Sequence, residues 1–267
     1  MRGRAAQHLV SHDSVRLGIA GVTLELRAPS VVLAATRMRY AGFVTQWEPA
    51  AVLEIRHAPP EFSALIDRGD GVDVVPNDDG WQLSGRLCGA VDSDGGWLAS
   101  APDLGAVDAL VRLALVRMLP AQGALPFHAA LTDDGTVFAG RSGAGKSTVA
   151  AALGGPCDEL SVVGAGIGGN AVSAWSTPYW GQRPVCVPLR RVVILDAADG
   201  DAAGIELLSA VDALRALSAQ VVRWAPLPSV DRPTFALLGE LCASVEVVRA
   251  RCPRGERFLP FIAEALS

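Results

Sequence analysis

Residues 140 to 147 read GRSGAGKS, and this stretch constrains the fold more than any other part of the chain. It matches the pattern G-x-x-x-x-G-K-[S/T] at every fixed position. Such a loop binds phosphate because its backbone N–H groups converge on one phosphate chain, between a strand and the start of a helix. The apolar run from Thr136 to Ala139 and the alanines after Ser147 predict that strand and that helix. The sequence therefore predicts an α/β fold with a nucleotide-binding loop.

The loop contains the residue types that phosphate binding requires. Its glycines let the chain wrap and keep side chains out of the phosphate space, while Lys146 can bridge the β- and γ-oxygens and Ser147 can offer its hydroxyl to Mg²⁺. The alternative interpretation is that the match arose by chance in a glycine-rich turn that does not bind phosphate. We expect ATP or another nucleoside triphosphate, together with Mg²⁺, to bind the run Gly140, Arg141, Ser142, Gly143, Ala144, Gly145, Lys146, Ser147 and Thr148.

Two adjacent acids follow the loop helix, in the segment PCDELSVV. Phosphoryl transfer to a hydroxyl requires a carboxylate for the metal and a base that orients the hydroxyl. Asp158 and Glu159 are the nearest candidates. Adjacent side chains of an extended segment point to opposite sides, so we expect one acid to reach the metal and the other to do something else. The alternative is a solvated acidic turn after Gly154-Gly155-Pro156.

His128 lies between apolar residues in LPFHAAL, in the segment before the loop strand. A lone histidine in such a setting is more often a hydrogen-bonded core residue. If the two segments form a hairpin that ends at the phosphate loop, the imidazole instead approaches the two acids. Both interpretations stay open at this point.

Four elements in this order resemble a known family. They are the FHAAL segment, the phosphate loop, the acidic pair, and the turn WSTPYWG followed by the apolar run VPLRRVVIL. Together they are similar to the HPr kinase/phosphorylase-related kinases, and most similar to the short, divergent bacterial members that accompany peptide natural-product clusters such as those of lasso peptides. The resemblance covers about residues 125 to 195 well.

The resemblance implies a P-loop fold shared with phosphoenolpyruvate carboxykinase and phosphoryl transfer from a nucleotide to a serine hydroxyl. It implies that Lys146 and Ser147 hold phosphate and Mg²⁺, that Asp158 is the base, that Glu159 contacts the metal, and that His128 lies near this pair. Homo-oligomers, which are frequent among the relatives, are implied by analogy only.

Two departures from the family pattern concern the acids. The second member of the pair is usually aspartate, and Glu159 is one methylene longer. The link from Leu153 to Asp158 is also short, so either Asp158 lies differently from its counterpart in relatives or the base is another residue. The extended signature that the phosphorylase reaction needs is not recognisable, and we do not expect HPr to be the substrate.

The segments on both sides of the motif suggest three parts. Residues 1–102 alternate apolar runs with turn clusters at Asp70-Gly71, Asp79-Gly80 and Asp94-Gly95, which predicts a β-rich N-terminal domain. The Arg68–Asp70 triplet is better explained as a turn than as an adhesion motif. Residues 103–120 have helical periodicity and predict a linker helix, unless they begin the second core. Residues 121–267 form the predicted P-loop, HPr-kinase-like catalytic domain.

Further elements are expected in the C-terminal part. Short strands are predicted around residues 160–163, 171–174 and 191–195, and a late strand over VEVVRARC. The segment GIELLSAVDALRALSAQVV is predicted as a helix, and PLPSVDRPTFALLGEL as a loop that ends in a helix. GAGIGGN is predicted as a flexible hairpin.

The composition excludes several classes of protein. The net charge of −5 and the pI of about 5.4 argue against a general nucleic-acid binder. Five scattered cysteines without a CxxC pair argue for reduced, buried thiols rather than disulfides or a zinc site. Without a secretory signal or a stretch of about 18 apolar residues, we expect a soluble, cytoplasmic protein that does not contact membranes.

Other polar and aromatic residues fit two interpretations each. Arg183, near Arg190 and Arg191, can contact phosphate or substrate, or can be surface charge. Trp175, Tyr179 and Trp180 can line a groove or pack in the core, and the arginines between residues 249 and 257 can dock an acidic peptide or face solvent.

The acceptor of the phosphoryl group remains open at this stage. A serine of a peptide or protein, including a natural-product precursor peptide, is the first hypothesis. A small-molecule alcohol is the second, and a nucleotide-binding regulatory or scaffold protein with little catalysis is the third.

Overall fold

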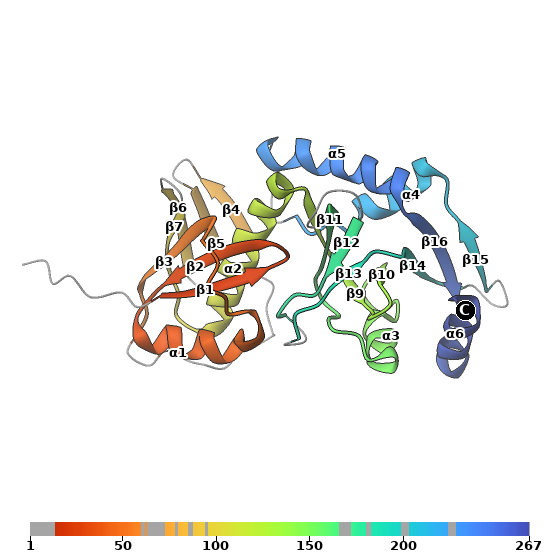
Figure 1. Ribbon diagram of the computed structural model, residues 1–267, viewed down its shortest axis with the longest axis horizontal. Coiled ribbons are helices and arrows are strands. Elements are labelled where there is room, and N and C mark those ends of the chain that lie inside the picture. The colour runs from red at the N-terminus through yellow and green to blue at the C-terminus, as the bar shows by residue number, and fades with distance from the viewer. Residues whose placement is uncertain are drawn as a thin grey trace, which may run out of the picture.

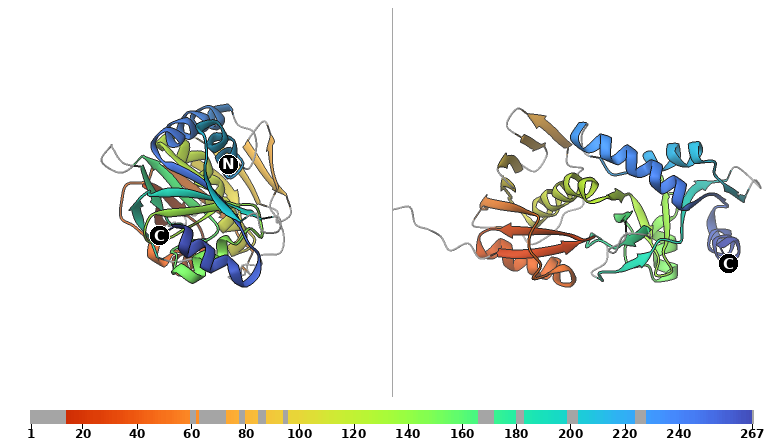
Figure 2. Two further views of the ribbon diagram at one scale, coloured as in Figure 1. Left: turned by 90° about the vertical axis from the view of Figure 1, so that its right-hand side faces the viewer. Right: turned by 45° about the horizontal axis from the view of Figure 1, so that its top comes forward.

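The computed structural model describes residues 14–59, 62, 73–77, 80–84, 88–93, 96–165, 172–179, 183–198, 203–223 and 228–266. It is an α/β structure in which the described strands form three sheets of seven, five and four strands. The seven-stranded sheet and the two smaller sheets lie toward opposite ends of the long axis, and helix α2 lies between them (Figures 1 and 2). The sequence prediction of an α/β fold with a β-rich N-terminal part is confirmed at this level.

The seven-stranded sheet has the order β1-β2-β3-β7-β6-β5-β4. Pairs β2/β3 and β3/β7 are parallel and the others are antiparallel. Helix α1 (Ser30–Arg39) and the 3₁₀ turn η1 (Ala41–Phe43) connect β2 to β3. The strands are β1 (Ser14–Ile19), β2 (Val22–Arg27), β3 (Ala51–His57), β4 (Asp73–Asn77), β5 (Gly80–Ser84), β6 (Cys88–Ser93) and β7 (Gly96–Ser100).

The predicted Asp-Gly turns fall mostly outside the described residues, as does the Arg68–Asp70 triplet. The strands on either side of the predicted turns at Asp79-Gly80 and Asp94-Gly95 are described. β4 pairs antiparallel with β5, and β6 pairs antiparallel with β7, as hairpins require. The predicted hairpin at 164–170 also lies outside the described residues beyond Ala165.

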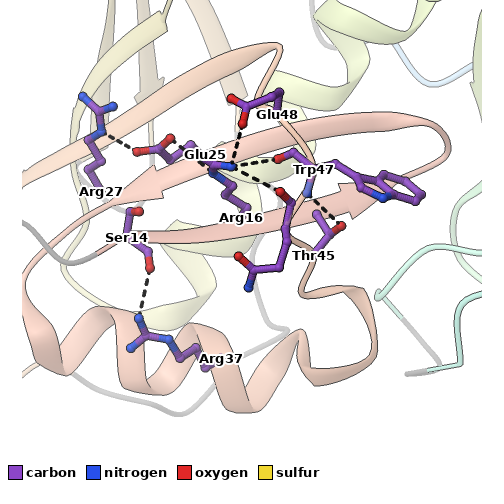
Figure 3. A network of polar contacts seen from close by, with 9 residues as sticks. Ser14, Arg16, Glu25, Arg27, Arg37, Thr45, Trp47 and Glu48 are labelled. Atoms are coloured by element: carbon purple, nitrogen blue, oxygen red, sulfur yellow. Dashed lines mark hydrogen bonds and ion pairs between the residues drawn. The ribbon is translucent and has the colours of Figure 1, made fainter.

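A polar cluster ties the first two strands to the segment that enters β3 (Figure 3). Arg16 and Glu25 are cross-strand partners on β1 and β2, and their side chains form an ion pair of 3.7 Å between Nε and Oε2. Arg16 also donates to the backbone carbonyl of Trp47 at 3.2 Å, and Arg27 donates to Glu25 at 2.7 Å. These bonds connect β1, β2 and the segment before β3 at the edge of the sheet.

Helix α2 (Leu104–Met118) begins at Asp103, whose side chain accepts a hydrogen bond of 2.8 Å from the backbone N–H of Ala106. Eleven of its 15 residues are buried. Eight of these eleven share one apolar cluster with the seven-stranded sheet and with Leu160, Val162, Trp175 and Tyr179 of the second part. The helix predicted as a linker is therefore a component of the core on both sides.

The five-stranded sheet, with the order β15-β16-β14-β10-β9, carries the phosphate loop. Alternate side chains of its central strands enter two different apolar clusters, one with α4 and α5 and the other with α3 and α6. Because helices cover both faces of the sheet, the central strands have apolar residues at consecutive positions in the sequence. The strands are β9 (Ala129–Leu131), β10 (Thr136–Gly140), β14 (Arg191–Ala197), β15 (Gly204–Leu207) and β16 (Glu246–Cys252).

The four-stranded sheet has the order β13-β12-β11-β8 and is antiparallel. Its strands are β8 (Ala124–Phe127), β11 (Ser161–Ala165), β12 (Val172–Trp175) and β13 (Cys186–Pro188). β8 and β9 are separated only by His128, so the chain passes from this sheet to the five-stranded sheet at that residue. The strands predicted around 160–163, 171–174 and 191–195 are confirmed.

Two C-terminal predictions were wrong in part. The segment that begins with GIELL was predicted as helix throughout, but Gly204–Leu207 pairs with β16 as strand β15, and the helix begins only at Ala210. Helix α5 begins at Pro228, near the start of the segment predicted as a loop, because a proline in the first turn needs no N–H partner. Pro233 lies further inside the helix, where it removes one backbone hydrogen bond. The remaining elements are η2 (Leu119–Gln122), α3 (Lys146–Leu153), α4 (Ala210–Ser218), α5 (Pro228–Ser244), η3 (Gly255–Arg257) and α6 (Phe258–Leu266).

Among the described residues, no helix combines the length and apolar character that crossing a bilayer would require. The described cysteines Cys157, Cys186, Cys242 and Cys252 are free thiols, as predicted. Burial raises the pKa of Cys157 to about 12 and that of Cys252 to about 11. Cys186 is exposed, so the prediction of buried thiols does not hold for it.

Candidate active site

The phosphate loop follows β10, which is parallel to β14, which is in turn parallel to β16. The carboxyl ends of these three strands, at Gly140, Ala197 and Cys252, therefore lie at one edge of the sheet. Ligands of open α/β sheets bind at this edge. Helix α3 begins at Lys146, as the motif predicts.

Two glycines of the loop have no room for a side chain. Gly140 has φ +156°, and a Cβ there would lie 2.6 Å from the backbone oxygen of Leu195. Gly145 has φ +105°, and a Cβ there would lie 2.4 Å from Cζ of the Phe258 ring. Gly143 also has positive φ, but no atom lies within 4 Å of its Cβ position. Close packing therefore requires glycine at positions 140 and 145, whereas Gly143 faces open space.

Lys146 is the only lysine in the chain. Its side chain is folded back into the loop, where Nζ donates to the carbonyl oxygens of Gly140 at 2.8 Å and Arg141 at 3.1 Å. Burial lowers the pKa of Lys146, and the nearby Asp158 carboxylate opposes that shift. The ammonium group is therefore held at the phosphate loop and faces an acid.

Two cavities flank the loop. The first, of about 350 Å³, will be called the acidic cavity, and the second, of about 520 Å³, the strand-end cavity. The acidic cavity is lined by His128, Ser142, Gly143, Gly145, Lys146, Ser147, Thr148, Asp158 and Glu159. The strand-end cavity is lined by Gly143, Ala144, Gly145, Thr148, Asp196, Ala197, Cys252, Pro253, Arg254, Gly255 and Phe258.

The short link after α3 does bring the acids to the loop. Gly154 ends the helix with φ +67°, and the N–H of Gly155 donates to the carbonyl of Ala150 at 2.7 Å. A Cβ on Gly155 would lie 2.5 Å from the backbone oxygen of Leu131, so the chain turns directly against β9. The backbone of Cys157 then pairs with that of Leu131 in an isolated antiparallel β-bridge. Asp158 follows at once and lines the same cavity as Lys146 and Ser147.

Asp158 and Glu159 both line the acidic cavity, although their segment was predicted to be extended. The chain bends at these two residues and is not extended there. Their surroundings differ. Asp158 is only 4% exposed, and its Oδ1 is buried without a hydrogen-bond partner. Glu159 is partly exposed and accepts a hydrogen bond of 3.1 Å from Arg112 on α2.

The Thr177-Pro178-Tyr179 turn supports the acidic segment. The hydroxyl of Thr177 donates to the backbone carbonyl of Leu160, directly after the acids. Thr177 and Tyr179 are both buried. For Tyr179 and Trp175 the core interpretation is confirmed, and Trp180 lies outside the described residues.

His128 lines the acidic cavity, and its side chain is exposed. The interpretation as a core histidine was therefore wrong, because the chain leaves one sheet and enters another at this residue and turns the side chain outward. Partial burial and the positive charge of Lys146 lower the pKa of His128. The imidazole is thus favoured in its neutral form beside the two acids.

Several arginines considered in the sequence lie outside the acidic cavity. Arg183 pairs with Asp133 at 2.8 Å and is not among the cavity residues. Arg190 pairs with Asp134, and Arg191 with Glu246. Arg249 and Arg251 pair with Glu206.

Arg254, one of the arginines considered between residues 249 and 257, lines the strand-end cavity. Sequence reasoning missed three other residues near the site: Arg112, which contacts Glu159, and Asp196 and Phe258, which line the strand-end cavity. They come from α2, the end of β14 and the segment after β16, so no local pattern connects them with the motif. Only Arg112 could have been noticed in the sequence, because it is a charged residue four positions after Asp108 in a mainly apolar helix.

The oxygen donors of the acidic cavity fit a magnesium ion. They are the unpartnered Oδ1 of Asp158, the carboxylate of Glu159 and the hydroxyl of Ser147. Magnesium in nucleotide sites is held by one or two carboxylates and by phosphate oxygens. Within the described part of the chain, no group of three or more His, Cys, Asp or Glu side chains gathers as a complete metal site of its own.

Comparison with known proteins found no matching family model and no matching curated protein.

Proposed function

We propose that the protein is an ATP-dependent kinase of the P-loop, HPr-kinase-like type that transfers a phosphoryl group to a hydroxyl. The observation that carries the proposal is the buried, unpartnered Oδ1 of Asp158 in the cavity that also contains Lys146 and Ser147. An unpaired carboxylate oxygen is costly to bury. A hydroxyl donor or a cation would satisfy it, and a phosphate loop brings both chemistries together.

The two cavities suggest how the nucleotide lies. Its triphosphate follows the loop, with the γ-phosphate in the acidic cavity beside Lys146. The strand-end cavity, which is larger and has few charged groups, then receives the nucleoside. There Asp196 can accept hydrogen bonds from ribose hydroxyls, and Phe258 and Pro253 offer apolar surface to the base.

In the proposed reaction, Asp158 orients the acceptor hydroxyl and takes its proton. The acceptor oxygen forms a bond to the γ-phosphorus, the bond from that phosphorus to the β,γ-bridging oxygen breaks, and ADP leaves with the bonding electrons. Lys146 bridges β- and γ-oxygens throughout. Ser147 and Glu159 would hold Mg²⁺, which when bound neutralises charge on the phosphate oxygens.

The acceptor is proposed to be a serine on a peptide or protein. His128, Ser142 and Ser147 at the cavity are exposed. A hydroxyl presented on a chain can therefore approach Asp158 from solvent without a closed pocket around it.

Nucleotide binding can be tested without knowing the acceptor, because Lys146 is the single lysine. An acyl-phosphate derivative of ATP should acylate Lys146, and ATP with Mg²⁺ should protect it, as read by peptide mass spectrometry. Absence of protected labelling would refute nucleotide binding at this loop.

Transfer is tested by incubating the protein with ATP, Mg²⁺ and peptides encoded beside its gene, and by measuring a gain of phosphate on serine by mass spectrometry. Loss of that gain in Asp158→Asn supports the kinase. Phosphate on a small alcohol only would replace the peptide acceptor. Protected labelling of Lys146 without transfer to any peptide or metabolite would favour a nucleotide-binding scaffold.

A further inference from the structure

One face of the buried helix α2 carries two charged side chains, Asp108 and Arg112, one helical turn apart. Asp108 is 8% exposed and accepts hydrogen bonds from the Tyr40 hydroxyl and from Arg39 on the N-terminal side. Arg112 points to the other part of the molecule, where it reaches Glu159. This face therefore connects α1 of the N-terminal part with an acid of the proposed active site.

The guanidinium group of Arg112 is held by two contacts. NH1 donates to Oε1 of Glu159 at 3.1 Å, and the guanidinium carbon lies 4.2 Å from the centre of the Tyr179 ring. Tyr179 is itself buried and belongs to the turn that supports the acidic segment. Because the ring and the helix fix Arg112, the position of its donor is fixed relative to Glu159.

The ion pair is better explained by positioning than by stability. The side chains of Arg112 and Glu159 are 24% and 42% exposed, and pairs this exposed add little to the stability of a fold. Glu159, however, is a long and partly exposed side chain next to a buried carboxylate of the same charge. Without a cation beside it, repulsion from Asp158 would favour rotamers that point Glu159 out of the cavity.

We propose that Arg112 is a positioning residue that holds Glu159 in the orientation that binds Mg²⁺. The inference rests on the proposed function. A carboxylate has about four acceptor positions, so one hydrogen bond from Arg112 leaves Glu159 able to bind a cation. In this arrangement α2 supplies the partner that the longer glutamate needs, and the N-terminal part contributes to the metal site through Arg39, Tyr40 and Asp108.

The test measures the Mg²⁺ concentration needed for half-maximal binding of a fluorescent, non-hydrolysable ATP analogue. Arg112→Met keeps an apolar side chain beside Tyr179 and removes the donors. We expect it to raise that concentration about tenfold, as loss of a second-shell partner of a metal ligand does. Binding of the analogue without Mg²⁺ should not change, and Arg112→Lys should restore part of the affinity for Mg²⁺.

Two controls separate positioning from general effects. Arg56→Ala removes another arginine–glutamate pair, with Glu54 at 2.8 Å in the N-terminal sheet, and should leave the Mg²⁺ dependence unchanged. In a Glu159→Gln background, Arg112→Met should have no further effect, because the group that it positions is no longer a carboxylate.

An unchanged Mg²⁺ midpoint in Arg112→Met would overturn the inference. A lower midpoint would overturn it as well, since it would mean that Arg112 competes with the ion for Glu159. If the wild-type protein binds the analogue equally with and without Mg²⁺, the proposed metal site itself fails, which distinguishes that result from failure of Arg112 alone. Thermal unfolding of each variant confirms that it is folded.

Discussion

The two cavities on either side of the phosphate loop share Gly143, Gly145 and Thr148 but differ in chemistry. The acidic cavity contains two carboxylates, a histidine and the only lysine, and one of its carboxylate oxygens is buried without a partner. The strand-end cavity is larger and is formed by the ends of β14 and β16 and the start of α6.

This difference suggests a division of roles around one loop. Lys146 and His128, whose pKa values are lowered mainly by burial, lie with Asp158 on the side where bonds would change. The other side offers shape, apolar surface and a single carboxylate, Asp196, which suits binding. Variants on the two sides should therefore separate transfer from binding.

Asp158→Asn should have the largest effect. We expect phosphoryl transfer to fall about 10³-fold, because general-base catalysis contributes about 10²- to 10⁴-fold. Nucleotide binding should persist, since the phosphate loop is intact. Transfer is measured by mass spectrometry of the acceptor, and Asp133→Asn, which removes an exposed carboxylate paired with Arg183, serves as the control. Full transfer by Asp158→Asn would remove Asp158 as the base.

Lys146→Ala should reduce transfer about 10²-fold, because removal of one preorganised donor to the reacting group costs about 10²- to 10³-fold. Lys146→Arg should not restore it, since a planar guanidinium does not fit the position of a compact ammonium between two loop carbonyls. Initial rates at saturating ATP provide the measurement. Wild-type rates in Lys146→Arg would show that only the charge matters at this position.

Gly143 and Gly145 line both cavities, and substitution by alanine tests how closely the loop packs at each of them. Gly145→Ala should destabilise the protein by about 1–3 kcal/mol, because positive φ is strained for alanine and its Cβ would collide with Phe258. Gly143→Ala is the matched control, with positive φ but open space around Cβ, and should cost less. Urea unfolding measures both. Equal losses would show that contact with Phe258 contributes nothing.

Asp196→Ala should weaken ADP binding about tenfold, because a hydrogen bond to a charged group contributes about 1.5–3 kcal/mol. Binding of inorganic tripolyphosphate, which lacks a ribose, should be unchanged. Calorimetry with both ligands measures the difference. Arg249 pairs with both Asp196, at 3.3 Å, and Glu206, but Glu206 does not line the cavity, so Glu206→Ala is the control. Equal weakening of both ligands would argue against a nucleoside in the strand-end cavity.

The smallest expected effect concerns His128 and pH. The pKa of His128 is lowered in the folded protein, so as pH falls below about 6.5 the unfolded chain takes up the proton first and the folded state loses stability. His128→Gln should reduce this loss. The measurement is the change in melting temperature between about pH 7.5 and about pH 5.5. An identical change in the variant would mean that the histidine does not contribute.

Local patterns predicted the elements with strong periodicity. The strand before the loop, the loop helix and helix α2 were all expected from the sequence and are present. The segment 204–207 was missed, because a short strand at a sheet edge is defined by its partner β16 and carries no periodicity of its own. The change of sheet at His128 was also not predictable. Only the tertiary structure shows that β8 pairs in the four-stranded sheet and β9 in the five-stranded sheet.

The candidate site was predicted unevenly for the same reason. The loop residues and the acidic pair form short runs whose chemistry is local, and the structure brings them into one cavity. For Arg183 the sequence left phosphate contact and surface charge open, and the structure pairs it with Asp133 at the surface. Arg112 and Asp196 belong to elements remote in sequence, and their approach to the loop depends on packing.

The sequence by itself predicted the loop at residues 140–147, because its glycines set the backbone geometry and its lysine and serine supply the side chains within eight consecutive residues. The tertiary structure decided whether Asp158 could reach that loop, through the turn of Gly154 and Gly155 against β9. It also decided that Glu159 would have Arg112 as its partner, since that contact depends on how α2 packs between the two parts of the chain.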